Sequence, residues 1–135
     1  MDYVVDACAI IAFLNDEPGA GTVARLLNQA ETGADRLFMS SVQVLEVYYD
    51  RIYVRGREYA DTVLDSLYAS PIIVLPRITH DAIREAGKFK TSYSMSLADA
   101  LAAATTKTLA ATLVTKDSEL KAAEEAGEFP ILWLA

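Results

Sequence analysis

The sequence is poor in the residues that form disulfides and soft-metal sites. It has one cysteine, Cys8, one histidine, His80, and one tryptophan in 135 residues. A single cysteine excludes an intramolecular disulfide, a zinc knuckle and a cysteine-held cluster. Nothing in the sequence ties Cys8 to His80, the one candidate base for a thiol nucleophile, so we expect Cys8 to be a small buried thiol.

Long apolar runs and an excess of cations are also missing. The longest unbroken apolar run, Ala7 to Leu14, is far shorter than the ~20 residues of a membrane-spanning helix, and no cationic segment precedes it. We therefore expect a cytoplasmic protein that does not enter membranes. The net charge of −7 argues against nonspecific coating of nucleic acid. It leaves a nuclease open, because bound metal ions neutralise part of such a charge.

Short β-rich segments alternate with longer helical patterns, which is typical of a parallel sheet covered by helices. The pattern predicts a single α/β domain over residues 1–135, with a five-stranded parallel sheet flanked by helices in the order β-α-β-α-α-β-α-α-β-α-β. The strands are expected at 3–5, 37–39, 72–75, 112–115 and 131–134. Helices are expected at 41–54, across 60–68 after a break at Gly56, at 80–88, at 97–109, and from 117 or 118 to about 127.

Four acidic residues suggest a function. Asp6 ends the first expected strand and Asp117 follows the fourth by two residues, so both lie at the carboxyl edge of the sheet, where such sheets bind ligands. Glu46 has no basic residue one turn away, and Asp99 is the only polar residue in LADALAAA. Such carboxylates are costly to desolvate unless they are paired, hydrogen-bonded or bound to a cation.

Each acid also has a plain structural interpretation, which the sequence leaves open. Asp6 and Asp117 have the positions of helix N-caps. Asp99 has the spacing of a capping-box acid that answers Ser96, and Glu46 is a good helix former that solvent alone can satisfy.

Taken together, the acids indicate a site for a hard divalent cation. Like charges that crowd together raise one another's pKa unless a cation neutralises them. Oxygen ligands without a nearby histidine or a thiolate pair favour Mg²⁺, with Mn²⁺ as the possible substitute, over zinc. Such an ion polarises a phosphoryl oxygen and activates water for in-line displacement.

Four segments resemble the motifs of PIN domains, and more specifically those of the VapC-type toxin ribonucleases. They are VVDACAIIAFL with Asp6, SSVQVLEVYY with Glu46, SLADALAAATT with Asp99, and ATLVTKDSEL with Thr115 and Asp117. The resemblance covers the whole chain. It implies an Mg²⁺-dependent endoribonuclease that acts on RNA, forms a homodimer and is inhibited by a cognate antitoxin protein.

The resemblance also implies roles for single residues. Asp6 and Asp99 would be the principal metal ligands, and Glu46 and Asp117 would complete the acidic pocket. Thr115 would orient Asp117 or a water, although a β-branched residue is also ordinary in a strand. Two positions depart from the family pattern. Cys8 stands where relatives usually have Ser or Thr, and Glu119 stands where many have Asp.

Basic and aromatic residues near the acids are candidate RNA contacts, or simply solvated charges. These candidates are Arg51, Arg55, Arg57, Lys88, Lys90 and Tyr93. The other aromatic residues of interest, Tyr48, Tyr49, Tyr53 and Trp133, are expected in the core or in dimer contacts.

Three other interpretations of these acids place different demands on the sequence. A haloacid-dehalogenase-type phosphatase needs a second carboxylate two residues after the first aspartate, where this chain has Cys8. A receiver-type signalling module needs an aspartate at the end of its middle strand, where this chain has IIVLPR. The alternative that the sequence leaves open is a catalytically inactive PIN-like module that binds a metal or a partner.

Overall fold

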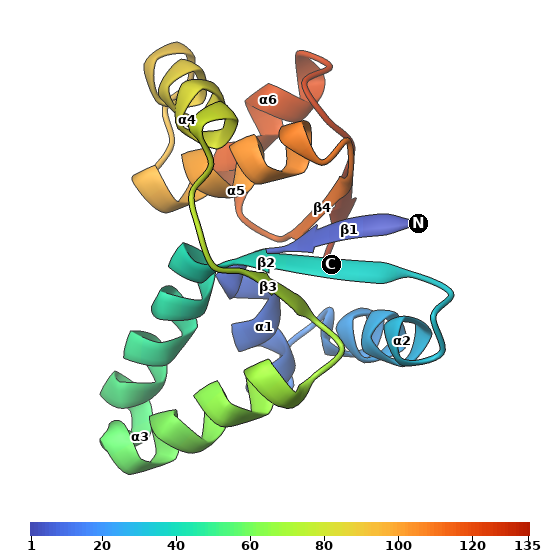
Figure 1. Ribbon diagram of the computed structural model, residues 1–135, viewed down its shortest axis with the longest axis vertical. Coiled ribbons are helices and arrows are strands. Elements are labelled where there is room, and N and C mark those ends of the chain that lie inside the picture. The colour runs from blue at the N-terminus through green and yellow to red at the C-terminus, as the bar shows by residue number, and fades with distance from the viewer.

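Five parallel strands form one sheet at the centre of the computed structural model, which describes residues 1–135 (Figure 1). The sheet order is β3-β2-β1-β4-β5, and every adjacent pair is parallel. The strands are β1 (Asp2–Val5), β2 (Arg36–Ser40), β3 (Ile73–Leu75), β4 (Thr112–Thr115) and β5 (Ile131–Trp133). The predicted fold class is confirmed, and each predicted strand is present within one residue at either end.

Helices cover both faces of the sheet (Figure 1). One face carries α1 (Ala7–Leu14), α2 (Ala20–Glu31) and α3 (Ser41–Ala69). The other carries α4 (His80–Ser92), α5 (Leu97–Thr108), the 3-10 turn η1 (Ser118–Leu120) and α6 (Lys121–Glu125). None of these helices has the length and apolar character that crossing a membrane requires.

The prediction of one helix between the first two strands is wrong. The chain forms α1 and α2 there, and Gly19 separates them with a φ of 99°. A Cβ at this position would lie 2.8 Å from the Cβ of Leu134, so both the backbone conformation and the close approach require glycine. The separation depends on this contact with the far end of the chain, which local periodicity does not reveal.

The predicted break at Gly56 is confirmed. α3 consists of two helical arms that meet at Gly56, which adopts a φ of 86° and a ψ of 174°, outside the helical region. The chain therefore turns back at this point, and the second arm of α3 returns toward the sheet (Figure 1). Val63 and Leu67 on this arm are buried in the core, which holds the arm against α1.

Two apolar clusters, one on each face, pack the helices onto the sheet. Strand residues alternate between them, so that Val5 belongs to the cluster of α1, α2 and α3, whereas Val4 belongs to that of α4 and α5. α5 is buried almost all round, and its alanines from Ala100 to Ala104 let it approach the sheet closely. This packing fixes the start of α5, which carries Asp99, beside the carboxyl edge.

Candidate active site at the carboxyl edge of the sheet

Asp6 follows β1 and is the N-cap of α1. Its Oδ1 accepts hydrogen bonds from the Ala9 backbone N–H and from the Cys8 thiol, both at 3.0 Å. Burial raises the pKa of its carboxyl, hydrogen bonds from Thr115 and Cys8 oppose this, and the charge of Asp117 adds to it. The N-cap interpretation is confirmed, and the same carboxylate lies within electrostatic range of the other acids.

Asp99 has a carboxylate that its helix does not use. The Ser96 hydroxyl accepts the Asp99 backbone N–H at 3.1 Å, which is one half of the expected capping box. The other expected bond, from the Ser96 N–H to the Asp99 side chain, is absent. That N–H donates to Oε1 of Glu119 at 3.2 Å. Asp99 is 8% exposed, and its buried Oδ2 has no hydrogen-bond partner. Burial, with Glu119 and Asp117 nearby, raises the pKa of this carboxyl to about 9.

The turn after β4 brings two further acids to Asp99. Asp117 is the N-cap of η1, where its Oδ1 accepts the Glu119 N–H at 3.0 Å. Thr115 Oγ1 accepts the Asp117 N–H at 3.0 Å and lies 3.4 Å from Cys8 Sγ, so this buried hydroxyl holds the turn beside α1. Carboxylate oxygens of Asp99, Asp117 and Glu119 all lie within 4.8 Å of one another.

Glu46 approaches the cluster from α3. It is half-buried and has no hydrogen bond or ion pair. Burial raises the pKa of its carboxyl, and the negative charges of Asp6 and Asp117 raise it further. Glu46 and Asp6 stand outside the tight group of three, which contains Glu119 instead. The sequence marks Glu119 only as a departure from the family pattern, but its position two residues after Asp117 already indicates that it lies near the site.

Gln43 is a further site residue that the sequence did not reveal. Its Oε1 accepts the Ala7 N–H and its Nε2 donates to the Ala98 carbonyl, both at 2.8 Å. One buried side chain therefore joins the starts of α1, α3 and α5, the three helices that present Asp6, Glu46 and Asp99. In the sequence, Gln43 is marked only by capping-box spacing from Ser40, whose hydroxyl accepts the Gln43 backbone N–H at 3.4 Å.

The cluster fits a hard divalent cation. All its candidate ligands are carboxylates, and Asp99 presents an oxygen that no group of the protein satisfies. Three acids with raised pKa values repel one another, and a cation relieves that repulsion. The neighbouring Cys8 stays a neutral thiol, because burial raises its pKa to about 12.

Only one of the basic residues named as candidate RNA contacts is buried. Arg51 is 2% exposed, and its guanidinium donates to Asp50 and Asn15, so both alternatives given for it, an RNA contact and a solvated charge, are wrong. Three others have partners within the chain: Arg55 over the ring of Tyr59, Lys88 beside Glu85, and Lys90 on the Met95 carbonyl.

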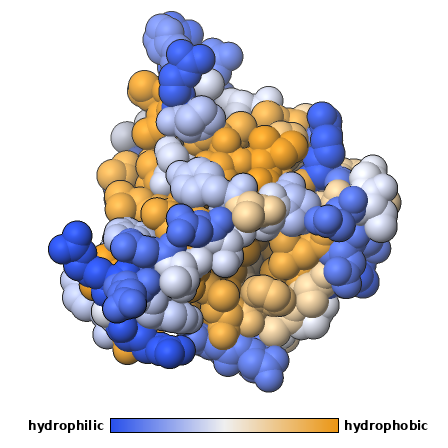
Figure 2. Space-filling model, turned by 60° about the horizontal axis from the view of Figure 1, so that its bottom comes forward, coloured by the Kyte–Doolittle hydropathy of each residue, from blue (hydrophilic) through white to orange (hydrophobic).

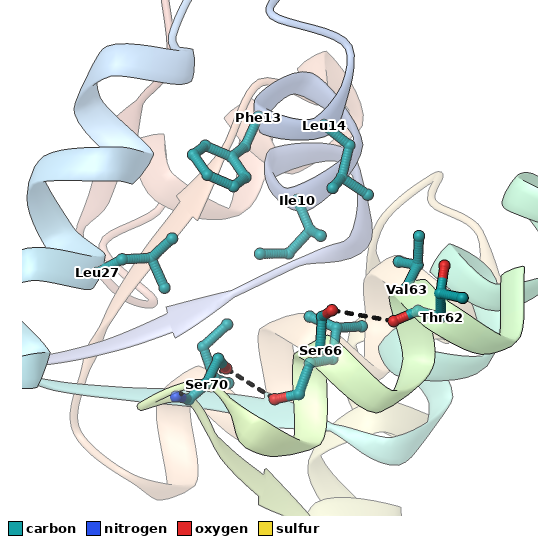
Figure 3. A pocket seen from close by; sticks show the side chains of 10 residues that line it. Ile10, Phe13, Leu14, Leu27, Thr62, Val63, Ser66 and Ser70 are labelled. Carbon is teal, nitrogen blue, oxygen red and sulfur yellow. Dashed lines mark hydrogen bonds between the residues drawn. The ribbon is translucent and has the colours of Figure 1, made fainter. Parts of the chain in front are cut away.

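An apolar groove lies apart from the acids, on the face of α1, α2 and α3. It encloses about 170 Å³, and seven of its ten lining residues are apolar. Ile10, Phe13 and Leu14 from α1 point toward Leu27 of α2 and Val63 of α3 (Figure 3). With the lower side of Figure 1 brought forward, apolar atoms reach the surface in patches between hydrophilic ones (Figure 2).

The family model of the PIN domain matches residues 3–126. The chain belongs to the PIN-domain family. The match covers the segments of all four predicted acids, and it confirms the resemblance to PIN domains that the motifs indicated. No curated protein sequence matches this PIN domain.

Solved structures share the fold of this PIN domain at low sequence identity. VapBC2 from Rickettsia felis, bound to a DNA fragment from its promoter, has a TM-score of 0.75 at 17% identity, over 100% of both chains. VapBC-1 from nontypeable Haemophilus influenzae has a TM-score of 0.72 at 20% identity, over 99% of this chain and 98% of that one. VapC20 from Mycobacterium tuberculosis, a sarcin-ricin loop cleaving toxin, has a TM-score of 0.68 at 17% identity, over 90% and 94%.

Proposed function

We propose that this PIN domain is a metal-dependent endoribonuclease of the VapC type, the toxin of a toxin–antitoxin pair, which acts on RNA in the cytoplasm. The observation that carries the proposal is the carboxyl group of Asp99, whose Oδ2 has no hydrogen-bond partner and which is buried beside Asp117 and Glu119 at the carboxyl edge of a PIN-family sheet. If the acids served only to stabilise the fold, this buried oxygen would be expected to have a hydrogen-bond partner.

In this proposal Asp6 and Asp99 are the principal ligands of Mg²⁺, or of Mn²⁺, and Glu46, Asp117 and Glu119 complete the acidic pocket. When bound, the ion supplies positive charge at the phosphoryl oxygens and makes water more acidic. The residues of the chain orient these ligands. The Cys8 thiol donates to Asp6, and Thr115 holds the backbone of Asp117.

We further propose that the cognate antitoxin protein binds the apolar groove between α1, α2 and α3. Two of the similar structures contain toxin–antitoxin complexes bound to DNA, which supports a protein partner of this kind. The groove is lined mostly by apolar side chains from three helices, and it suits the apolar face of an amphipathic helix.

A homodimer is the third part of the proposal. Leu45, Tyr49 and Tyr53 follow one another at four-residue spacing on the first arm of α3, and all three are exposed, Tyr53 by 86%. A continuous apolar stripe on a helix is typical of a protein interface. Analytical ultracentrifugation should find a dimer that Tyr49→Glu converts to a monomer. A monomeric parent protein would refute this part alone.

The nuclease activity is tested with purified protein and structured RNA. Cleavage should require Mg²⁺ or Mn²⁺, stop with chelator and return when the ion is restored. Asp99→Asn should reduce it at least about a hundredfold, whereas Asp81→Asn, which removes an exposed first-turn carboxylate from α4, should not change it. Cleavage that survives chelation or Asp99→Asn would refute the proposal. No cleavage despite metal binding would favour the inactive PIN-like alternative.

A further inference from the structure

A groove beside the acids is lined by two lysines and the only tryptophan of the chain. It encloses about 320 Å³ and is open to solvent, and its lining residues are Lys116, Ser118, Lys121, Trp133, Leu134 and Ala135. Lys116 and Ser118 stand on either side of Asp117 in the chain. Trp133 on β5 pairs in register with Thr115 on β4, so it lies at the same sheet edge as the acids.

We propose that this groove holds the RNA segment next to the scissile phosphate, with one base stacked on Trp133 and backbone phosphates on Lys116 and Lys121. The inference rests on the proposed ribonuclease function and assigns the part of the site that contacts single-stranded substrate. It replaces the expectation that Trp133 belongs to the core or to a dimer contact.

Trp133 is suited to stack on a base because a hydrogen bond orients its ring and the ring remains accessible to solvent. Its Nε1 donates to both carboxylate oxygens of Glu124 at 3.1 Å, which fixes the indole from one edge. The residue is nevertheless 37% exposed where it lines the groove. A ring that is already ordered loses little conformational entropy when a base stacks on it.

The two lysines supply positive charge beside the acids, which by themselves would repel the RNA backbone. Lys121 is exposed and has no hydrogen-bond or ion-pair partner. Lys116 pairs with Glu17 at 2.6 Å, but both side chains are partly exposed. An ion pair of this kind contributes little to stability, so a phosphate can replace Glu17 as the partner of Lys116. In a chain with a net charge of −7, two lysines on either side of Asp117 define where the RNA backbone can approach.

Because Trp133 is the only tryptophan, its fluorescence reports on this groove without any labelling of the protein. The experiment uses Asp99→Asn protein, which leaves RNA intact under the proposed function, and a single-stranded oligouridylate in the presence of Mg²⁺. Binding is followed by fluorescence anisotropy of end-labelled RNA, and stacking by quenching of Trp133 with unlabelled RNA. We expect both signals to saturate at the same Kd, and an abasic oligomer to bind without quenching.

Groove variants then test each contact against a matched control. Trp133→Leu should raise the Kd about tenfold. Lys121→Gln should raise the Kd and lower the slope of log Kd against log salt by about one. Arg25→Gln, which removes a charge from the exposed surface of α2, should change neither quantity. In the nuclease with Asp99 intact, Lys121→Gln should raise KM and leave kcat unchanged.

The outcomes separate this inference from the proposed function. RNA-dependent quenching of Trp133 in a protein that never cleaves RNA would support the groove and refute the nuclease. Cleavage by a protein whose Trp133 fluorescence does not respond to bound RNA would refute the groove and leave the nuclease standing. Absence of RNA binding would overturn the groove directly. The quenching measurement needs no groove variant, so a misfolded variant does not affect it.

Discussion

The backbone N–H of Ser96 donates to Oε1 of Glu119, although the acid at the capping-box position of α5 is Asp99. A side chain from the turn after β4 therefore completes the helix cap, and the carboxylate of Asp99 is left without a hydrogen bond at Oδ2. This arrangement makes Asp99 available to a cation at a cost in stability when no cation is bound.

That cost predicts a pH dependence. The folded Asp99 carboxyl, with a pKa of about 9, keeps its proton where the unfolded one, with a pKa near 3.8, has lost it. The folded state thus binds more protons between these values, and the free energy of unfolding falls as the pH rises through them. Asp99→Asn should raise the melting temperature by about 4 °C at pH 8, in chelator, and by less at pH 5.

Differential scanning fluorimetry at the two pH values measures this difference, with Asp65→Asn, at an exposed acid within α3, as the control that should change neither temperature. Mg²⁺ should raise the melting temperature of the parent protein more than that of Asp99→Asn. An equal or lower melting temperature for Asp99→Asn at pH 8 would mean that the carboxyl is satisfied in the folded protein.

Glu119 has two roles that substitutions can separate. Glu119→Gln keeps an oxygen that accepts the Ser96 N–H but removes the charge, whereas Glu119→Ala removes both. We expect both variants to bind Mg²⁺ more weakly, and only Glu119→Ala to lose about 1 kcal/mol of stability with the lost cap. Metal titrations and chemical denaturation measure the two effects. If Glu119→Gln binds Mg²⁺ like the parent protein, Glu119 serves the cap alone.

Gln43 should matter for activity without contacting the reacting atoms. Gln43→Met has a similar volume but leaves the first-turn Ala7 N–H without a partner and removes the side-chain hydrogen bond to the Ala98 carbonyl, which should cost about 2 kcal/mol. Because these two groups begin α1 and α5, we expect a fall in kcat with little change in KM. Gln29→Met on α2 is the control. Full activity in Gln43→Met would show that core packing alone positions the acids.

The apolar groove gives a prediction about the partner. Phe13→Asp places a charge among apolar side chains and should weaken binding of the cognate antitoxin at least tenfold. RNA cleavage should persist, because the acids lie beyond the opposite end of α1. Ile83→Asp, at an exposed apolar position on α4, is the control. Isothermal titration calorimetry measures the affinity of each variant for the antitoxin. Unchanged affinity in Phe13→Asp would mean that the antitoxin binds elsewhere.

Features set by local sequence could be predicted, and those set by distant contacts could not. The five strands, the break at Gly56 and the cap at Asp6 follow from short patterns of hydrophobicity, glycine and side-chain oxygens. The separation of α1 from α2 depends on Gly19 meeting Leu134, which lies at the far end of the chain.

The same distinction applies to the site. The placement of Asp6 and Asp117 at one sheet edge follows from where the strands end. The bridge made by Gln43 spans 36 residues to Ala7 and 55 to Ala98, and the contact of Glu119 with Ser96 spans 23. Which residues form such long-range hydrogen bonds depends on how the helices pack, and a single sequence does not reveal that packing.

The turn at Gly56 divides α3 into two parts with different neighbours, since Glu46 belongs to the first arm and the α3 residues that line the apolar groove belong to the second. A Cβ at Gly56 would meet no atom within 4 Å, so the tip of this helical hairpin stands clear of the body. Adding whole turns to both arms would enlarge the outer surface without moving the sheet. A chain with longer arms would therefore present a different outer surface beside the same acidic edge.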